Sequence, residues 1–291
     1  MEIYNENNRF ISILSDYGFK ATFGNESDTT FLKKALQVLI DSSIPIKTIE
    51  FVKNEMMAIT IDSRSGIYDI ACVDENNNHF IVEMQLSEYP EFIQRMKFYA
   101  LHRFNTMVKK GAYKFENLSK IYCIGILAEN IFPQINHFHN IAVLRNTQNE
   151  IIDDQMTFIT IELAKFTKQL ADIQTDLDKL IYTMKTLHTV TEISEFPAFW
   201  NEEWLKKAIH EVDLRAMTAE QKLAYEMAIS ANALAVKNEN KKIAEAEEKK
   251  MTAFVESLLT KTNHTINQIA DIAEVSVEFV TNIQKKLLEG K

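Results

Sequence analysis

A pair of apolar segments joined by a short polar loop constrains the fold of this chain more than any other feature. Residues 67–73 (IYDIACV) and 79–86 (HFIVEMQL) are rich in β-branched and aromatic residues, which favour strands. Residues 74–78 between them read DENNN, a composition typical of turns because Asn and Asp side chains hydrogen-bond their own backbone. The pattern predicts an antiparallel hairpin, and therefore a β-sheet as part of the fold.

Helix and strand signals alternate through the rest of the N-terminal part. Apolar residues recur at helical spacing over residues 27–41, where Ser27 or Asp28 can cap the helix, and residues 90–110 also predict a helix. We therefore expect a mixed α/β core that ends near residues 165–170. Its further strands are expected at residues 46–52, 57–62, 120–128 and 158–163.

The remainder of the chain has a helical pattern. Residues 172–190 and 202–212 predict helices. Residues 218–250 are rich in Ala, Glu, Lys and Leu and contain neither Gly nor Pro, so one long helix is expected there. Charges of both signs alternate over residues 241–250, which favours a solvated helix face over a binding tract.

The last segment predicts two short helices joined by a turn. Thr265 can cap a helix over residues 266–273, a turn is expected at residues 274–276, and a second helix follows through Lys286. The chain is thus expected to comprise an α/β core (1–170), a helical region with the long helix (171–250) and a C-terminal helical segment (251–291).

The spacing of apolar residues in this last segment is that of a helix-turn-helix, at Ala270, Val275 and Val280. Glu274 stands at the turn position where Gly is usual, and Glu278 at the start of the second helix would meet phosphate poorly. These two features favour a packing or self-association device over a helix that reads DNA sequence, and the second interpretation stays open.

Charge and composition narrow the setting of the chain. It carries 32 Lys and Arg against 41 Asp and Glu, and the resulting charge of −9 argues against a simple basic coat for nucleic acid. Cys72 and Cys123 have no CxxC or CxxH spacing, so neither a disulfide framework nor a zinc site is expected. No apolar run reaches the ~20 residues that span a bilayer, and the N-terminus lacks a signal-peptide pattern, so we expect a cytoplasmic protein without membrane contact.

Candidate metal ligands lie on the predicted hairpin. Because side chains alternate along a strand, Glu83 and Gln85 share one face, and the hairpin brings Asp69 near them. Two neighbouring carboxylates repel each other unless a cation or a proton lies between them, and a hard ion such as Mg²⁺ or Mn²⁺ suits oxygen ligands. Glu-x-Gln between apolar residues is also the pattern of any half-solvated strand, so spacing alone leaves both interpretations open.

Several further motifs occur in a fixed order along the chain. Taken together with the hairpin, the sequence resembles the PD-(D/E)XK nuclease family transposases, also called recombination-promoting nucleases. The segments that carry the resemblance are residues 15–24 (SDYGFKATFG), 68–70 (YDI), 74–76 (DEN), 80–85 (FIVEMQ), Arg95-x-x-x-Tyr99, 121–127 (IYCIGIL), 161–166 (IELAKF) and 269–276 (IADIAEVS). They extend over nearly the whole chain.

The resemblance implies an α/β restriction-endonuclease-like core, a mixed central sheet flanked by helices, followed by an α-helical C-terminal region. It also implies a metal-dependent DNA endonuclease. In the family pattern, Asp69 and Glu83 would ligate Mg²⁺, with Mn²⁺ as a substitute, and the backbone carbonyl of Met84 would complete the inner shell. Gln85 joins the catalytic set where the superfamily more often has Lys; Gln can hydrogen-bond the attacking water but brings no positive charge.

The family's first motif is an acidic residue near the start of the chain. Asp16 is our candidate for this catalytic position, and Glu26 and Asp28 are the alternatives. The N-cap of a short helix is the other role open to Asp16.

Contacts to DNA are expected mainly from one basic segment. Residues 92–115 contain no acidic residue and six basic ones, interleaved with aromatic residues. Arg95 and Tyr99 share a helix face that we expect to point toward the active site, with Arg95 on a phosphate. The expected DNA-binding residues are Lys20, Arg95, Tyr99, Arg103, Lys109 and Lys110, although Lys109 and Lys110 fit solvated surface lysines equally well. Arg95 or Lys20 would also supply the charge that Gln85 lacks.

The leading hypothesis is therefore an Mg²⁺-dependent DNA endonuclease linked to recombination, transposition or defence against foreign DNA. A catalytically weakened, nuclease-derived DNA-binding module is the first alternative, because Gln85 replaces Lys and the chain is acidic. A helical scaffold whose residues 218–250 mediate oligomerisation is the second, and a homo-oligomer through the C-terminal helices is compatible with either activity.

Overall fold

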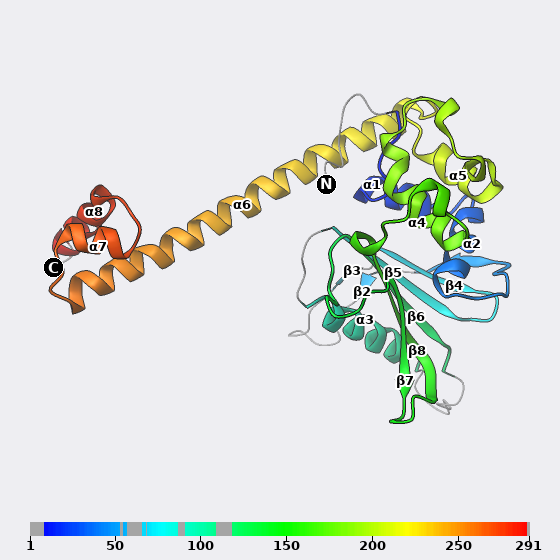
Figure 1. Cartoon of the computed structure of the whole chain (residues 1–291), viewed down its shortest axis with the longest axis horizontal. Coiled ribbons are helices and arrows are strands. Elements are labelled where there is room, and N and C mark those ends of the chain that lie inside the picture. The colour runs from blue at the N-terminus through cyan, green and yellow to red at the C-terminus, as the bar shows by residue number, and fades with distance from the viewer. Residues whose placement is uncertain are drawn as a thin grey trace. The chain divides into compact units, whose positions relative to one another are not determined.

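The structure is a computed structural model. In it the chain forms two compact units, residues 1–222 and 223–291 (Figure 1). Each unit is taken by itself. The residues described are 9–52, 55–56, 66–67, 69–86, 91–108 and 118–289.

The first unit is built on a mixed β-sheet, which confirms the expected fold class. Within the described residues it has six strands in the order β1-β4-β5-β6-β8-β7. β5, β6 and β8 are parallel, whereas β1, β4 and β7 pair antiparallel with their neighbours. The strands are β1 (Ile49–Phe51), β4 (Ile70–Asp74), β5 (His79–Gln85), β6 (Ile121–Leu127), β7 (His139–Arg145) and β8 (Ile151–Glu162), and β2 (Glu55–Met56) pairs separately with β3 (Gly66–Ile67).

The predicted hairpin is present as β4 and β5. Asp74 Oδ1 accepts hydrogen bonds from the backbone N–H groups of Asn76 (2.9 Å) and Asn78 (2.8 Å), and Asn77 has φ 60°. The first strand is shorter than expected, because β4 begins at Ile70 and Gly66–Ile67 pairs with β2 instead. Asp69 therefore lies at the entrance of the strand rather than within it.

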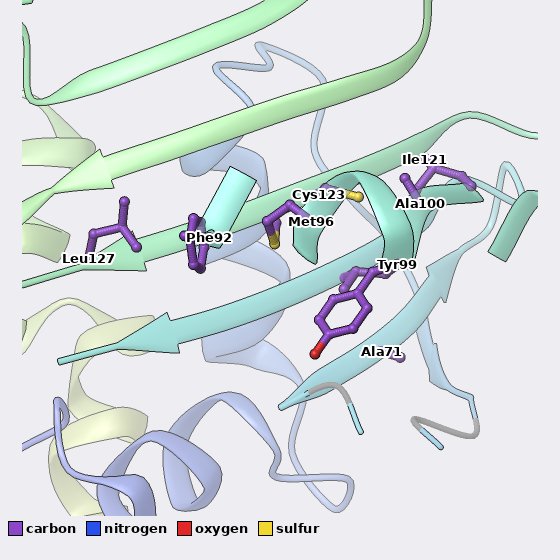
Figure 2. Packing of buried hydrophobic residues seen from close by; sticks show 9 residues of the cluster. Ala71, Phe92, Met96, Tyr99, Ala100, Ile121, Cys123 and Leu127 are labelled. Atoms are coloured by element: carbon purple, nitrogen blue, oxygen red, sulfur yellow. The ribbon is translucent and has the colours of Figure 1, made fainter. Parts of the chain in front are cut away.

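Helix α3 (Phe92–Met107) connects the parallel strands β5 and β6 and covers one face of the sheet. Figure 2 shows its buried side chains between the helix and the strands. Gly125 of β6 lets the helix approach, since a Cβ there would lie 2.4 Å from the Phe92 ring. The cluster comprises Ala71, Ile81, Phe92, Met96, Tyr99, Ala100, Ile121, Cys123 and Leu127.

The other helices of this unit form a separate group (Figure 1): α1 (Asp16–Phe23), α2 (Thr30–Leu39), α4 (Asp176–Thr186) and α5 (Glu203–Glu211). α2 contacts α4 and α5, and α1 contacts α5. Ion pairs join them between Lys34 and Asp176 (2.6 Å) and between Lys207 and Asp28 (2.7 Å). α4 and α5 thus share a unit with the sheet, although the sequence pattern suggested residue 170 as the end of the core.

Strand β7 and the first half of β8 were not expected from the sequence. Residues 151–155 lack the alternation of apolar and polar residues that predicted strands elsewhere. In the structure their side chains are exposed or half-exposed on both faces of the hairpin. The strand expected at residues 57–62 lies outside the described residues. Short 3₁₀ segments at Leu163–Lys165, Leu170–Asp172, Leu187–Thr189, Ile193–Glu195 and Ala198–Asn201 complete this part of the chain.

The second unit contains most of α6 (Ala219–Lys261), α7 (Ile266–Ile272) and α8 (Val277–Glu289). The long helix is confirmed and extends to 43 residues. Thr265 caps α7 as expected, with Gln268 completing a capping box. A small core joins the end of α6 to the two short helices: Val255, Ile269, Ala270, Ala273, Val280 and Ile283. In the described part of the chain, no helix is both long enough and apolar enough to cross a membrane.

The turn between α7 and α8 holds a residue in the left-handed region. Glu274 has φ 52°, a conformation that costs free energy for any residue with a Cβ. We expect Glu274→Gly to stabilise this unit by about 0.5–1 kcal/mol, measured as slower hydrogen exchange of α7 and α8 amides in the full chain. Glu274→Ala is the control, because it removes the carboxylate but keeps the Cβ. Equal protection in both variants would contradict the explanation.

The close approach of α3 to the sheet gives a second prediction. Gly125→Ala should reduce the free energy of unfolding of the first unit by about 1–3 kcal/mol, because the added methyl overlaps the Phe92 ring. Urea denaturation measures the change. Phe92→Leu in the same chain should recover part of the loss, whereas additive effects of the two substitutions would show that the ring is not the obstacle.

Candidate active site

Asp69 and Glu83 meet where strands β4 and β5 stop pairing through their backbones. Ile70 lies opposite Val82 in the register, so Asp69 lies one step further, opposite Glu83. There the side chains replace the backbone ladder: the N–H of Asp69 donates to Glu83 Oε1 (3.2 Å), and the N–H of Met84 donates to Asp69 Oδ2 (2.9 Å). Each carboxylate is thereby fixed by the backbone of the opposite strand.

The two carboxyl groups lie close together, with Glu83 buried and Asp69 half-buried. Glu83 is 4% exposed, and burial together with the neighbouring Asp69 raises the pKa of Glu83 to about 7. Burial likewise raises the pKa of Asp69 above its ordinary value. A pair of carboxylates held in this way is stabilised by a nearby cation.

Among the described residues, Arg95 of α3 is the basic residue in direct contact with this pair. Its Nη2 lies 3.3 Å from Glu83 Oε2 and 3.1 Å from Gln85 Oε1. It reaches them because α3 covers the sheet face on which Glu83 and Gln85 lie. The guanidinium carbon lies 5.6 Å from the centre of the Phe92 ring and 5.9 Å from that of Tyr99, within the range of cation–π attraction.

A pocket of about 250 Å³ opens beside Asp69. Lys20 and Glu26 reach it from α1 and the segment that follows α1. Lys20 pairs with Asp16 at 2.8 Å, and both side chains are about half exposed. The charge of Lys20 lowers the pKa of Asp69 and that of Asp16 raises it, so both act electrostatically on the carboxylate pair. The lining is Lys20, Gly24, Glu26, Phe51, Val52, Asp69, Ile70 and Ala71.

The family model described as PD-(D/E)XK nuclease family transposase matches residues 13–235. The chain belongs to this family. No curated protein and no solved structure matches it. Membership confirms the resemblance seen in the sequence and supports a nuclease-type hydrolase related to transposases.

The three candidates for the acidic first motif of this nuclease have different surroundings. Asp16 is not the N-cap of α1, because Ser15 takes that role and accepts a hydrogen bond from the N–H of Gly18. Glu26 lines the pocket beside Asp69. Asp28 is engaged elsewhere, since its pairing with Lys207 lowers its pKa to about 2. Asp16 and Glu26 are thus the candidates that lie near the pair.

The donor set at this site fits a hard divalent ion. Among the described residues, no group of three His, Cys, Asp or Glu side chains is placed to hold a metal, so the site offers two carboxylates. Mg²⁺ is commonly held by one or two carboxylates, with water and substrate phosphate as the remaining ligands. Asp69 and Glu83 therefore fit Mg²⁺ or Mn²⁺, whereas a structural zinc site would require more protein ligands.

The other expected DNA-binding residues lie in varied surroundings. Arg103 donates from Nε to His79 Nδ1 at 2.9 Å, at the opposite end of β5 from Gln85. Tyr99 is 7% exposed and belongs to the core beneath α3. Lys109 and Lys110 lie outside the described residues. The contact between His79 and Arg103 was missed, because nothing in the spacing of two residues on separate elements indicates it.

His79 provides a pH-dependent test of this packing. Burial and, to a lesser extent, the charge of Arg103 lower the pKa of His79 to about 4, whereas in the unfolded chain it is 6.5. The imidazole therefore stays neutral in the folded protein while the unfolded chain takes up a proton. This contribution to stability is complete above pH 6.5 and is lost as the pH falls toward 4.

Between pH 7.5 and pH 5.0 we expect this group to lower the free energy of unfolding by about 2 kcal/mol. His79→Gln keeps an acceptor for Arg103 but cannot titrate, so its urea stability should fall less than that of the parent by this amount. His264→Gln, at an exposed position, should behave like the parent. The same pH dependence in His79→Gln and the parent would refute the assignment.

Proposed function

We propose that this chain is a divalent-metal-dependent DNA endonuclease that hydrolyses phosphodiester bonds at the Asp69–Glu83 pair. The observation that carries the proposal is the pair itself: the buried carboxylate of Glu83 and the half-buried carboxylate of Asp69, each bound by a backbone N–H group from the other side of the hairpin. Such an arrangement costs stability in the absence of a cation and is therefore better explained by function than by packing. Membership in a family of nuclease transposases supports the same reaction.

In this proposal Asp69, Glu83 and the backbone carbonyl of Met84 hold Mg²⁺, with Mn²⁺ as a substitute. When bound, the ion lowers the pKa of a water molecule and offsets the charge that develops on the scissile phosphate. Gln85 orients that water through its amide, which can both donate and accept a hydrogen bond. Asp16 or Glu26 completes the acidic first motif beside the pocket.

Positive groups around the pair would hold the DNA backbone. Lys20 lines the pocket, and Arg95 lies on Glu83 and Gln85, so both are close enough to bind phosphates next to the cleaved bond. Arg103, Lys109 and Lys110 would extend the contact along the strand. Tyr99 would act through its ring against Arg95, since its own side chain is buried. Cleavage should accordingly weaken as salt rises.

The biological setting that fits this activity is recombination or transposition, or defence against foreign DNA in the cytoplasm. The helices of the second unit would serve assembly, for example as a homo-oligomer. α7 and α8 pack on the end of α6 through a core of their own, which supports a packing role for this segment.

A second candidate is a nuclease-derived module that binds DNA without cutting it. The specific observation in its favour is Gln85, which is neutral, and among the described residues no group of three His, Cys, Asp or Glu side chains is placed to hold a metal. Such a module would retain DNA in a salt-dependent manner and would not nick it with any divalent ion.

Nicking of supercoiled plasmid with EDTA, Mg²⁺ or Mn²⁺ separates these functions. We expect nicking with either ion and none with EDTA. Asp69→Asn and Glu83→Gln keep the shape of the site but remove one charge each, and should slow nicking at least about 100-fold, equivalent to about 2.7 kcal/mol. Glu50→Gln, on an exposed position of β1, is the matched control and should nick as the parent does.

Parent-like rates in both site variants would refute the proposed mechanism. Absence of nicking by the parent, together with DNA retention that falls steeply with salt, would establish the binding module instead.

A further inference from the structure

One guanidinium nitrogen of Arg95 serves two acceptors at the candidate site. Nη2 contacts Glu83 Oε2 and Gln85 Oε1, at 3.3 and 3.1 Å. The side chain of Glu83 is 5% exposed and that of Arg95 24% exposed, so the pair is mostly shielded from solvent. An ion pair in such surroundings is stronger than one at the surface.

The oxygen atoms of Glu83 are both engaged. Oε1 accepts from the N–H of Asp69, which is part of the backbone, and Oε2 is engaged by the side chain of Arg95. A divalent cation that used Glu83 as a ligand would therefore displace a side chain at Oε2 more readily than a backbone group at Oε1. A divalent cation on Glu83 would lie close to the guanidinium of Arg95, and like charges a few ångströms apart repel each other.

Packing holds helix α3 in place, whereas the side chain of Arg95 can still change its rotamer. Phe92 lies against Gly125, and Met96 and Ala100 belong to the buried cluster, so α3 cannot withdraw as a whole. The side chain of Arg95 is 24% exposed, so a change of rotamer can move its end away from Glu83 while the helix stays in place.

We infer that Arg95 and a divalent cation are alternative partners of Glu83, so that binding of the ion transfers Arg95 from the carboxylate to a phosphate of the substrate. This inference rests on the proposed function and adds a coupling to it. Arg95 lowers the affinity for metal when DNA is absent, and metal raises the affinity for DNA because it releases Arg95. By thermodynamic linkage, DNA must then raise the affinity for metal by the same factor.

Metal affinity in the absence of DNA tests the first half of the coupling. Mn²⁺ binding is measured by isothermal titration calorimetry at pH 8.5, above the pKa of Glu83 (about 7). We expect Arg95→Gln to bind Mn²⁺ at least fivefold more tightly than the parent. Lys97→Gln, which removes a charge from an exposed position of the same helix, is the matched control and should leave the affinity unchanged.

DNA affinity tests the second half. Fluorescence anisotropy of a labelled duplex is followed with EDTA and with Ca²⁺, a hard ion that takes the same oxygen ligands. In the parent, Ca²⁺ should tighten DNA binding at least tenfold. In Arg95→Gln this factor should fall to threefold or less, whereas in Lys97→Gln it should stay that of the parent. Circular dichroism confirms folding, and Arg95→Lys, which keeps the charge but cannot form the same fork, replaces Arg95→Gln if the latter does not fold; its Mn²⁺ affinity should lie above that of the parent.

Unchanged or weaker Mn²⁺ binding in the Arg95 variant would overturn the inference, as would an unchanged Ca²⁺ factor. Failure of the proposed function has a different signature. In that case the parent binds no Mn²⁺, or Glu83→Gln binds it as tightly as the parent does.

Discussion

Exchange of hydrogen bonds between Asp69 and Glu83 across two strands is the constraint on which the rest of the site depends. In an ordinary antiparallel pair, the strands are joined by hydrogen bonds between backbone N–H and C=O groups alone. Here the carboxylate of each strand binds an N–H group of the other. These backbone N–H groups thereby find acceptors, and the two acidic side chains are held together, with Glu83 buried and Asp69 half-buried. A nearby cation stabilises such a pair of carboxylates.

The positive charge of the site comes from a helix rather than from a strand. Gln85 is neutral, and Arg95 reaches the carboxylate pair from α3. Packing of Phe92 on Gly125 positions the helix, and the rings of Phe92 and Tyr99 both lie within cation–π range of the guanidinium. A substitution in the core can therefore alter the electrostatics of the site without touching a polar residue.

The sequence allowed the hairpin and its acidic residues to be predicted, because turn composition and strand alternation are local signals. The same signals placed Asp69 inside a strand over residues 67–73, whereas β4 begins at Ile70 and the N–H of Asp69 donates to the side chain of Glu83. Strand β7 escaped prediction because it is half solvated and lacks alternation. The contact between Arg95 and Glu83 depends on the packing angle of α3, which no local pattern encodes.

The acidity of the chain also has a different meaning once the site is seen in three dimensions. A net charge of −9 speaks against a broad basic surface, yet hydrolysis of a phosphodiester requires positive charge at only one place. In the proposed function, the negative charge of Asp69 and Glu83 attracts a divalent ion, and the bound ion would reverse the local sign. Arg95 contacts Glu83, and Lys20 lines the pocket beside Asp69. Charge at this site is thus organised over a few ångströms, and under the proposed function the net charge of the whole chain would affect the residence time of DNA rather than the ability to cut it.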